Sequence, residues 1–189
     1  MIIEAIITTQ TAAGTCHVTP MGFRWVDGRV RLAPFVPSTT LDNLRRERSA
    51  IINLTDNVRI FAGCLTGHRE FNLVRTDLIS GWRLADALVH YELEVDEMIA
   101  DEQRPVFFCK VLARAIHGEF QGFNRAQAAI VEAAILISRL EFLSPDKVAS
   151  EMKYLHTAVA KTGGENELEA WRWLTEAVAA HPRHVALQL

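Results

Sequence analysis

The chain has 189 residues, of which 49% are hydrophobic and 23% are charged. These are ordinary values for a globular protein, and they exclude an intrinsically disordered chain. Twenty basic residues stand against 23 acidic ones, which gives a net charge of -3. A chain with this balance has no polybasic surface for nucleic acid or for an anionic membrane. The length predicts one domain with an extension, or two small domains.

The cysteines and the amino terminus bear on the cellular compartment. Cys16, Cys64 and Cys109 lie far apart, are odd in number and form no CxxC pair. This pattern argues against a disulfide framework and against a zinc knuckle, and it favours a reducing compartment. The opening residues lack the basic start and the cleavage site of a signal peptide, and no run is apolar enough to span a bilayer. We therefore expect a cytoplasmic protein.

The first half of the chain shows the alternation and the turn residues of β-strands. Strands are expected over seven segments: 2–9, 17–26, 29–36, 49–54, 58–65, 90–98 and 105–116. Asp27-Gly28 is a tight-hairpin signal between the second and third segments, because a type I′ turn needs positive φ at both central residues. Strands at this spacing, with one short helical insert, are typical of a small β-barrel rather than of a βαβ sheet.

The helical insert begins in a run of hydroxyl residues. Ser38, Thr39 and Thr40 precede a helical stretch that reaches about residue 48, and Thr39 with Asp42 resembles a capping box. Three hydroxyls and free backbone amides at a helix start form an anion site, since the N–H groups and the helix dipole both favour negative charge. Plain N-capping is the alternative, and it needs only one of the three hydroxyls.

After Gly122 the pattern changes to helices. Asn124 is a good N-cap for an almost wholly apolar helix over 125–140, which must be covered on most sides. A second helix begins at Ser144-Pro145 and ends before residue 164, and a third covers 165–180. We therefore expect a barrel domain over 1–122 and a helical extension over 123–189, packed on the barrel or on a dimer seam. The helices carry nearly equal numbers of acidic and basic residues, which argues against a helix-turn-helix.

Further positions are candidates for ligand contact. Thr19-Pro20-Met21 lies inside a predicted strand, and because proline cannot donate to the ladder this is a bulge, an edge or a place where a ligand meets open backbone. Asn53 ends a buried strand, where its amide needs partners, or it caps the following turn at Thr55-Asp56. Trp82 is expected in a loop, placed to cover a flat ring.

Other chemistries find little support. The chain has no GxGxxG, Walker A, HExxH or GxSxG motif. The arginines at 45, 46 and 48 suit a phosphate, but a solvated helix face is the favoured interpretation. His181 and His184 make a poor metal pair, and we expect no metal site. His17 and His68 are candidate proton donors, although a lone histidine is more often only hydrogen-bonded.

Together these motifs resemble the FMN-binding split-barrel superfamily, with its flavin reductase-like and pyridoxamine-phosphate-oxidase-like members. More narrowly, the chain is similar to a functionally uncharacterised family of archaea and methylotrophic bacteria. The resemblance covers nearly the whole chain and rests on the order and spacing of weak motifs. These motifs are Ile2 to Thr9, Gly14-Thr15, Val18 to Gly22, Ser38 to Leu44, Ile52 to Asp56, Asn124-Arg125-Ala126 and Lys161 to Gly164.

The resemblance implies a mainly β protein: a six-stranded FMN-binding split barrel with a C-terminal extension of three helices. It also implies a homodimer that holds FMN at the dimer interface. Four positions match contacts of the phosphate: Ser38, Thr39, Thr40 and Asn43. Five positions match contacts of the rest of the flavin, with Thr19, Pro20 and Met21 beside the isoalloxazine and with Asn53 and Thr55 at the ring or the ribityl chain.

Superfamily members include flavin reductases that use NAD(P)H, pyridoxamine-phosphate oxidases and binding proteins without turnover. We therefore expect a flavin-dependent oxidoreductase of the flavin-reductase type, with NADH, NADPH or a deazaflavin as electron donor. The alternatives are a non-catalytic flavin- or pterin-binding homodimer linked to one-carbon metabolism, and a structural dimer with an empty barrel. Neither nucleic acid nor a membrane is an expected partner. No residue is an obvious acid or base for a substrate, so the catalytic residues stay open.

Overall fold

The computed structural model describes residues 1–184. The chain forms two compact units, one made of residues 1–55 and 71–120, the other of residues 56–70 and the described residues from 121 onward. The sequence predicts a single boundary after residue 122, and it does not anticipate that the segment 56–70 clusters with the C-terminal helices.

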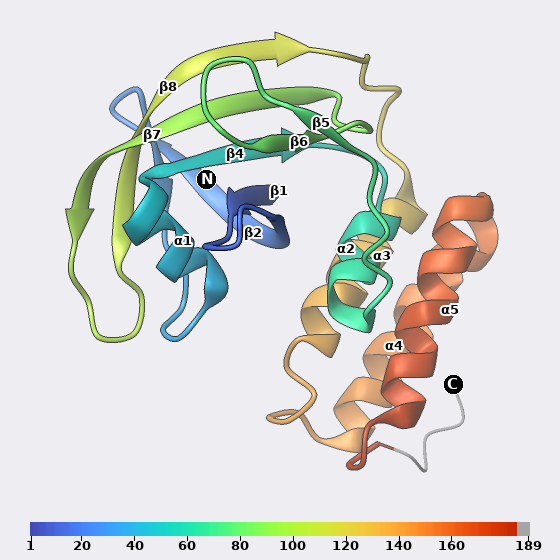
Figure 1. Cartoon of the computed structure of the whole chain (residues 1–189). Helices are drawn as coiled ribbons and strands as arrows, with labels where there is room; N and C mark the ends of the chain where they lie inside the picture. Colours follow the sequence, from blue (N-terminus) through green and yellow to red (C-terminus); the bar gives the residue numbers. More distant parts are fainter. Residues whose placement is uncertain (185–189) are drawn as a thin grey trace. The chain divides into compact units, whose positions relative to one another are not determined.

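The first unit is built on a barrel. In residues 1–184, six antiparallel strands close in the order β1-β2-β3-β8-β7-β4. They are β1 (Ile3–Gln10), β2 (Cys16–Val26), β3 (Arg29–Leu32), β4 (Ser49–Leu54), β7 (Val89–Ile99) and β8 (Val106–Ile116). Figure 1 shows β4, β7 and β8 side by side, and helix α1 (Thr39–Glu47) packs on β1 and β2. The prediction of a mainly β protein with a small barrel is confirmed.

The turn between β2 and β3 has the predicted geometry. Asp27 and Gly28 have φ values of 49° and 76°, as a type I′ turn requires. Strand β3 is shorter than predicted and ends at Leu32 instead of Val36. The reason is that Pro34 has no N–H to donate to a ladder. Because β3 is short, it pairs only with residues 24–26 of β2 and residues 107–109 of β8.

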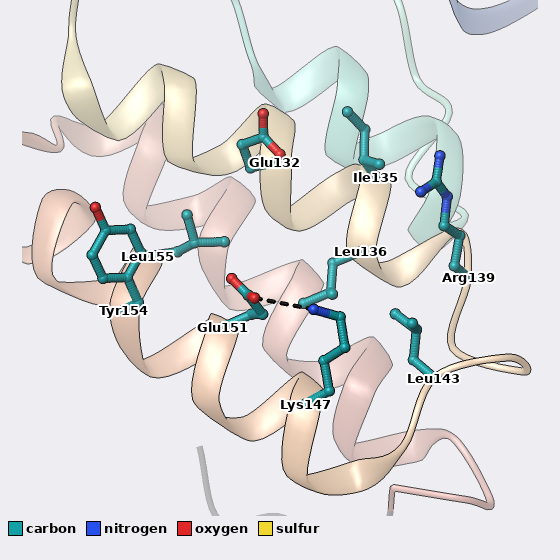
Figure 2. Close-up of a pocket in the computed structure, with 9 residues that line it drawn as sticks. All are labelled: Glu132, Ile135, Leu136, Arg139, Leu143, Lys147, Glu151, Tyr154 and Leu155. Atoms are coloured by element: carbon teal, nitrogen blue, oxygen red, sulfur yellow. Dashed lines mark hydrogen bonds and ion pairs between the residues drawn. The ribbon is translucent and has the colours of Figure 1, made fainter.

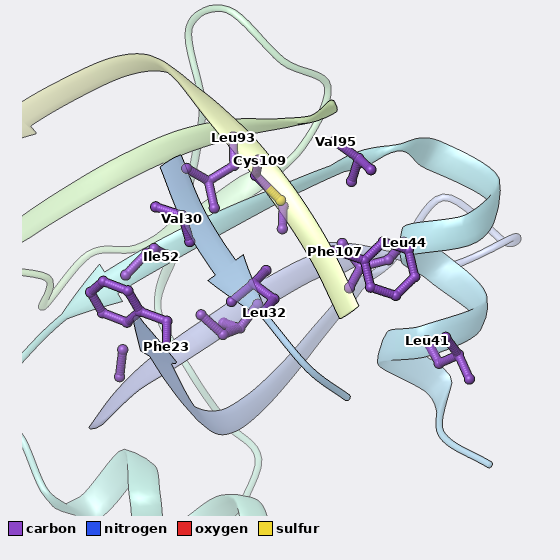
Figure 3. Packing of buried hydrophobic residues seen from close by; sticks show 13 residues of the cluster. Phe23, Val30, Leu32, Leu41, Leu44, Ile52, Leu93, Val95, Phe107 and Cys109 are labelled. Carbon is purple, nitrogen blue, oxygen red and sulfur yellow. The ribbon is translucent and has the colours of Figure 1, made fainter. Parts of the chain in front are cut away.

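One hydrophobic cluster fills the barrel (Figure 3). Leu41 and Leu44 of α1 belong to it together with Phe107 of β8, so α1 buries its apolar face on the barrel core. Each fully buried side chain of this kind contributes about 1.5–3 kcal/mol through removal of apolar surface from water. The members are Ala5, Ile7, Phe23, Val30, Leu32, Leu41, Leu44, Ala50, Ile52, Leu93, Val95, Phe107 and Cys109.

A second, two-stranded sheet was not predicted. It pairs β5 (Leu73–Arg75) with β6 (Trp82–Leu84). Trp82 therefore lies in a strand and not in a loop, and the Arg75 guanidinium lies 3.9 Å from the centre of its ring. Strands of three residues are too short to show an alternation in the sequence, and this hairpin owes its place to contacts with the barrel.

The segment predicted as a strand over 58–65 is a helix, and that prediction is wrong. Helix α2 (Arg59–Thr66) buries Ile60, Phe61 and Cys64 and packs on α3 and α5. A short apolar run does not distinguish a buried strand from a buried helix, and only the helical partners decide between them. This helix brings the segment 56–70 into the second unit.

The C-terminal helices are close to those predicted. They are α3 (Arg125–Ile137), α4 (Pro145–Thr162) and α5 (Glu165–Ala180). Asn124 accepts hydrogen bonds from two backbone amides at the start of α3, and Ser144 accepts one at the start of α4. On α5, Leu168 is 51% exposed, whereas Trp173 is buried. No helix within residues 1–184 has the length and apolarity needed to cross a bilayer.

Candidate functional site

The start of α1 provides backbone donors with a hydroxyl cap. The predicted capping box of Thr39 with Asp42 is wrong, because Thr39 is the first residue of the helix and Ser38 is the N-cap. The Ser38 Oγ accepts a hydrogen bond of 3.2 Å from the amide of Leu41. Helix geometry gives the amides of Thr39 and Thr40 no carbonyl within the helix to bind. Thr39 is exposed, whereas Thr40 is only 3% exposed. The structure therefore supports both capping by Ser38 and an anion site that is open at Thr39.

Asn43, on the buried face of the same helix, is occupied by contacts within the protein. Its Nδ2 donates a hydrogen bond of 2.9 Å to Thr9 Oγ1, and its Oδ1 accepts one of 3.0 Å from Arg46. Arg46 also donates to the Gln10 carbonyl at 2.6 Å. These contacts join α1 to the end of β1 and hold the helix start in place.

The Thr19-Pro20-Met21 segment lies on an open strand edge. In the described part of the chain, β2 pairs with β1 at residues 16–23 and with β3 only at 24–26. The segment therefore has a ladder on one side alone, and its register with β1 shows no bulge. Of the three explanations for the proline, the edge is confirmed. Met21 packs against the barrel core.

The facing edge of the opening is formed by β8. Strand β3 pairs with β8 only at 107–109, so beyond residue 109 the described partner of β8 is β7. We call the opening between these edges of β2 and β8 the open sector. Trp25, which pairs with Val30 of β3, meets Tyr91 of β7 edge to face with ring centres 5.6 Å apart, and Arg114 lies 5.9 Å from the Tyr91 ring. Trp25 is 44% exposed, so an aromatic surface faces outward.

Sequence reasoning missed this aromatic group. Trp25, Tyr91 and Arg114 come from three strands that are far apart along the chain, and only the barrel closure brings them together. The one available signal was Trp25, an aromatic residue on the same predicted strand as Thr19-Pro20-Met21.

Asn53 is fully buried and holds the β5–β6 hairpin to the barrel. Its Nδ2 donates to the Ile6 carbonyl at 3.1 Å and to Thr8 Oγ1 at 3.2 Å, and its Oδ1 accepts a bond of 2.8 Å from the Leu84 amide. The side-chain amide therefore finds the partners that its burial requires, across three strands. Thr55 Oγ1 donates to the Asp86 carbonyl at 3.0 Å.

A buried carboxylate, that of Glu92, binds the loop between β5 and β6. Glu92 of β7 is 0% exposed and accepts hydrogen bonds of 2.8–3.1 Å from the amides of Asp77, Leu78 and Ile79. Burial raises the pKa of Glu92, but the three N–H donors outweigh it, and the pKa lies below its ordinary value of 4.5. His90 flanks it on the same strand. The alternation of polar residues in a strand was the signal that sequence reasoning did not use.

This carboxylate predicts an acid-sensitive loop. A carboxyl with a lowered folded pKa stabilises the fold above its ordinary value of 4.5, and that stabilisation is lost as the pH falls through the folded pKa. We expect the amides of residues 77–79 to be protected from hydrogen exchange above pH 4.5 and to lose protection below it. The control is the Ala85 amide, which bonds to the Asn72 carbonyl in the same region. Equal protection of all four amides down to global unfolding would contradict the assignment.

The cysteines are not activated nucleophiles. Burial raises the pKa of Cys16 and Cys64 to about 11 and that of Cys109 to about 12. Only the thiolate reacts readily, so all three thiols are expected to react with iodoacetamide at pH 8 far more slowly than free cysteine. Mass spectrometry after timed labelling measures this, with the protein unfolded in guanidinium as the control. Rapid labelling of the folded protein at any of the three would be inconsistent with this.

The second unit contains a groove of about 380 Å³ between α3 and α4 (Figure 2). An ion pair of 3.2 Å joins Lys147 and Glu151 along it. The groove contains none of the predicted site residues. Within residues 1–184 no group of three or more His, Cys, Asp or Glu side chains is arranged to hold a metal ion. His68 stacks on Trp173 with ring centres 4.2 Å apart, so this histidine packs α2 against α5.

Comparison with solved structures shows which proteins share this fold. The fold is similar to that of an FMN-bound protein from Methanosarcina mazei described under DUF447, with a TM-score of 0.80, 21% identity, and 93% of this chain and 94% of that chain covered. A flavin reductase of Haemophilus somnus, described as putative, gives a TM-score of 0.53 at 15% identity over 62% and 81% of the chains. The styrene monooxygenase flavin reductase of Pseudomonas putida S12 gives 0.51 at 15% identity over 60% and 77%. No curated protein matches the chain.

Two family models match the sequence itself. Residues 3–118 match the model described as the N-terminal domain of a protein of unknown function, DUF447, and residues 124–176 match the model described as a protein of unknown function, DUF447. The first match alone covers more than half of the chain and includes the open sector, the start of α1 and the Asn53 contacts. The chain belongs to the DUF447 family.

Proposed function

We propose that this protein binds FMN and acts as a flavin-dependent oxidoreductase of the flavin-reductase type. The observation that carries the proposal is the similarity in fold, over nearly the whole chain, to an FMN-bound member of the same family. Similarity of the barrel to two flavin reductases supports the reaction type. The features of the chain itself decide how well a flavin fits.

The start of α1 fits a phosphate. The amides of Thr39 and Thr40 point out of a helix N-terminus, where the backbone dipoles favour an anion. The exposed Thr39 hydroxyl adds a donor beside them. Thr40 is too buried for its hydroxyl to meet a ligand without movement, so we assign the phosphate contacts to Ser38, Thr39 and the first-turn amides.

The open sector fits a flat aromatic ring. It presents the Thr19-Pro20-Met21 segment of β2, which has a ladder on one side alone, and Trp25 on the same strand is 44% exposed. Aromatic faces and edges stack favourably on one another, and the backbone edge supplies hydrogen-bonding groups for ring heteroatoms. Helix α1 packs on β2, which carries this edge, and on its neighbour β1.

Asn43 and Asn53 fit a ligand less well. Their side-chain amides are bonded within the protein, and both N–H groups of Asn53 have protein acceptors. We therefore assign both residues to holding the site together: Asn43 fixes α1 on β1, and Asn53 fixes β6 on β1 and β4. A contact of Asn53 with the ring would require these bonds to rearrange.

A bound flavin supplies the electron transfer, because its ring accepts and donates electrons in one- or two-electron steps. The residues of the chain hold the phosphate, orient the ring against the β2 edge and limit the access of water. We further propose a homodimer in which a second copy covers the open sector, because two uncovered strand edges are otherwise open to uncontrolled pairing. The three free thiols support a reducing compartment such as the cytoplasm.

The test is the visible absorption spectrum of the purified protein, with any released chromophore identified by mass. We expect a flavin spectrum with FMN released on denaturation, followed by bleaching when NADH, NADPH or a reduced deazaflavin is added without oxygen. Bound FMN that no donor reduces would overturn the reductase part and favour a flavin- or pterin-binding protein linked to one-carbon metabolism. A colourless protein that also fails to bind added FMN would overturn the whole proposal.

A further inference from the structure

Three side chains form a chain across the outer face of β7 to the end of β8. Glu92 and His90 are buried on β7, with 1% and 4% of their side chains exposed, and His117 follows β8 at the surface. His90 Nε2 lies 3.6 Å from Glu92 Oε1, which is too long for a hydrogen bond but within ion-pair range when His90 is protonated. On the other side of the ring, His90 Nδ1 lies 2.8 Å from His117 Nε2, which is a hydrogen bond. The chain thus leads from a buried carboxylate to an exposed imidazole.

The contacts determine where the protons lie when both imidazoles are neutral. His90 Nε2 faces a carboxylate, so it carries the hydrogen, because a lone pair there would be repelled. His90 Nδ1 is then the acceptor, and His117 Nε2 is the donor of the 2.8 Å bond. His117 Nδ1 then carries a lone pair and no hydrogen, and the His117 side chain is exposed. The arrangement is that of a base oriented by a second group, which is oriented by a third.

Burial and the charges around His117 together lower the pKa of its imidazole. Burial lowers the pKa of His117, as do the nearby Arg83 and His90, whereas Asp77 raises it, and the net direction is downward. Two acidic residues lie near these positions in the sequence: Asp86 shortly before β7 and Glu119 two residues after His117. The lowered pKa of His117 favours the neutral imidazole, which is the form that has a lone pair to accept a proton.

We propose that Glu92, His90 and His117 form a proton relay, with His117 Nδ1 as an acid–base site for a small molecule that bears a weakly acidic hydroxyl or ring N–H. His117 Nδ1 takes the proton of the bound molecule. The proton on His117 Nε2 then passes to His90 Nδ1, and the positive charge comes to lie beside the Glu92 carboxylate. The reverse sequence returns the proton. His117 touches the reacting proton, whereas His90 and Glu92 are positioning residues.

The relay differs from the proposed function in what it requires. It uses no atom of a flavin, and it supplies the acid–base residue that neither the motifs nor the open sector provides. One proton per histidine pair is its signature. A second proton would place N–H against N–H across 2.8 Å, so the two rings can take up only one proton between them.

The first experiment is NMR of the full chain, without flavin, labelled with ¹⁵N in its histidines. At neutral pH we expect both His90 and His117 in the Nε2–H form, and on acidification we expect them to shift together with one shared apparent pKa. An Nδ1–H form of either residue, or two independent transitions like that of the exposed His156, would overturn the relay. Because the protein carries no flavin here, this result is independent of the outcome for FMN.

Two variants locate the charge. Glu92→Gln is expected to move the joint protonation of the pair to lower pH, because it removes the carboxylate beside His90. His117→Asn leaves the Glu92 bonds to the loop intact and is expected to remove the coupling, so that His90 titrates alone. The control, His156→Asn, is expected to change neither. An unchanged shared pKa in Glu92→Gln, or unchanged His90 titration in His117→Asn, would overturn the relay even if one variant proved unstable.

Discussion

Thr39→Ala is expected to weaken FMN binding about ten- to a hundredfold without lowering the stability of the protein. The exposed hydroxyl beside the first-turn amides of α1 is assigned to the phosphate, and a hydrogen bond to a charged group contributes about 1.5–3 kcal/mol. Titration of FMN, followed by its fluorescence, measures the change in Kd.

Thr39 is a sharper test than its neighbours. Ser38 caps the helix, so Ser38→Ala costs about 1 kcal/mol of stability in addition to any loss of affinity. Thr40 is buried, so its replacement perturbs the packing of α1. The matched control is Thr157→Ala, an exposed threonine on α4 in the other unit, which is expected to leave Kd unchanged. An unchanged Kd in Thr39→Ala would reject the phosphate assignment at this helix.

Asn53→Ala is expected to lower the free energy of unfolding by about 2–4 kcal/mol, with or without flavin. The substitution leaves the Leu84 amide and the Ile6 carbonyl without their bonds from Asn53 in a fully buried place, and each buried polar group left unsatisfied costs about 1–3 kcal/mol. Urea denaturation of the flavin-free protein measures the loss.

The control for Asn53 is Asn72→Ala, an exposed residue next to β5. Its side chain is at the surface, so we expect a change within about 0.5 kcal/mol. If Asn53→Ala kept the stability of the unaltered protein and lost affinity for FMN instead, Asn53 would be a ligand contact and not a link between strands. The pair of variants therefore separates the two roles that the buried asparagine can have.

The α1 residues and Asn53 have different roles in the structure, although the sequence resemblance assigns both to the flavin. From sequence, the residues of α1 and Asn53 are all flavin contacts. In the structure, the α1 start leaves donors open, whereas the Asn53 amide is used by Ile6, Thr8 and Leu84. Burial and hydrogen-bond satisfaction, which a motif does not record, distinguish them.

Local signals were sufficient for much of the fold. Positive φ at Asp27-Gly28 and the caps at Asn124 and Ser144 each depend on the chemistry of one or two residues. A cap needs an oxygen at the right place, and a proline lacks an N–H wherever it stands. Such features are determined by the sequence alone.

Features that depend on partners distant in the chain were decided only by tertiary structure. Helix α2 was predicted as a strand because a short apolar run is ambiguous until α3 and α5 cover it. The β5–β6 hairpin is held by Asn53 and Glu92. The Glu92–His90–His117 chain exists only because the start of β7 lies beside the end of β8. The sequence by itself determined the barrel class and the helix ends, since these rest on local propensity. Closure of the barrel decided which polar side chains are used up within the fold and which remain open to a ligand.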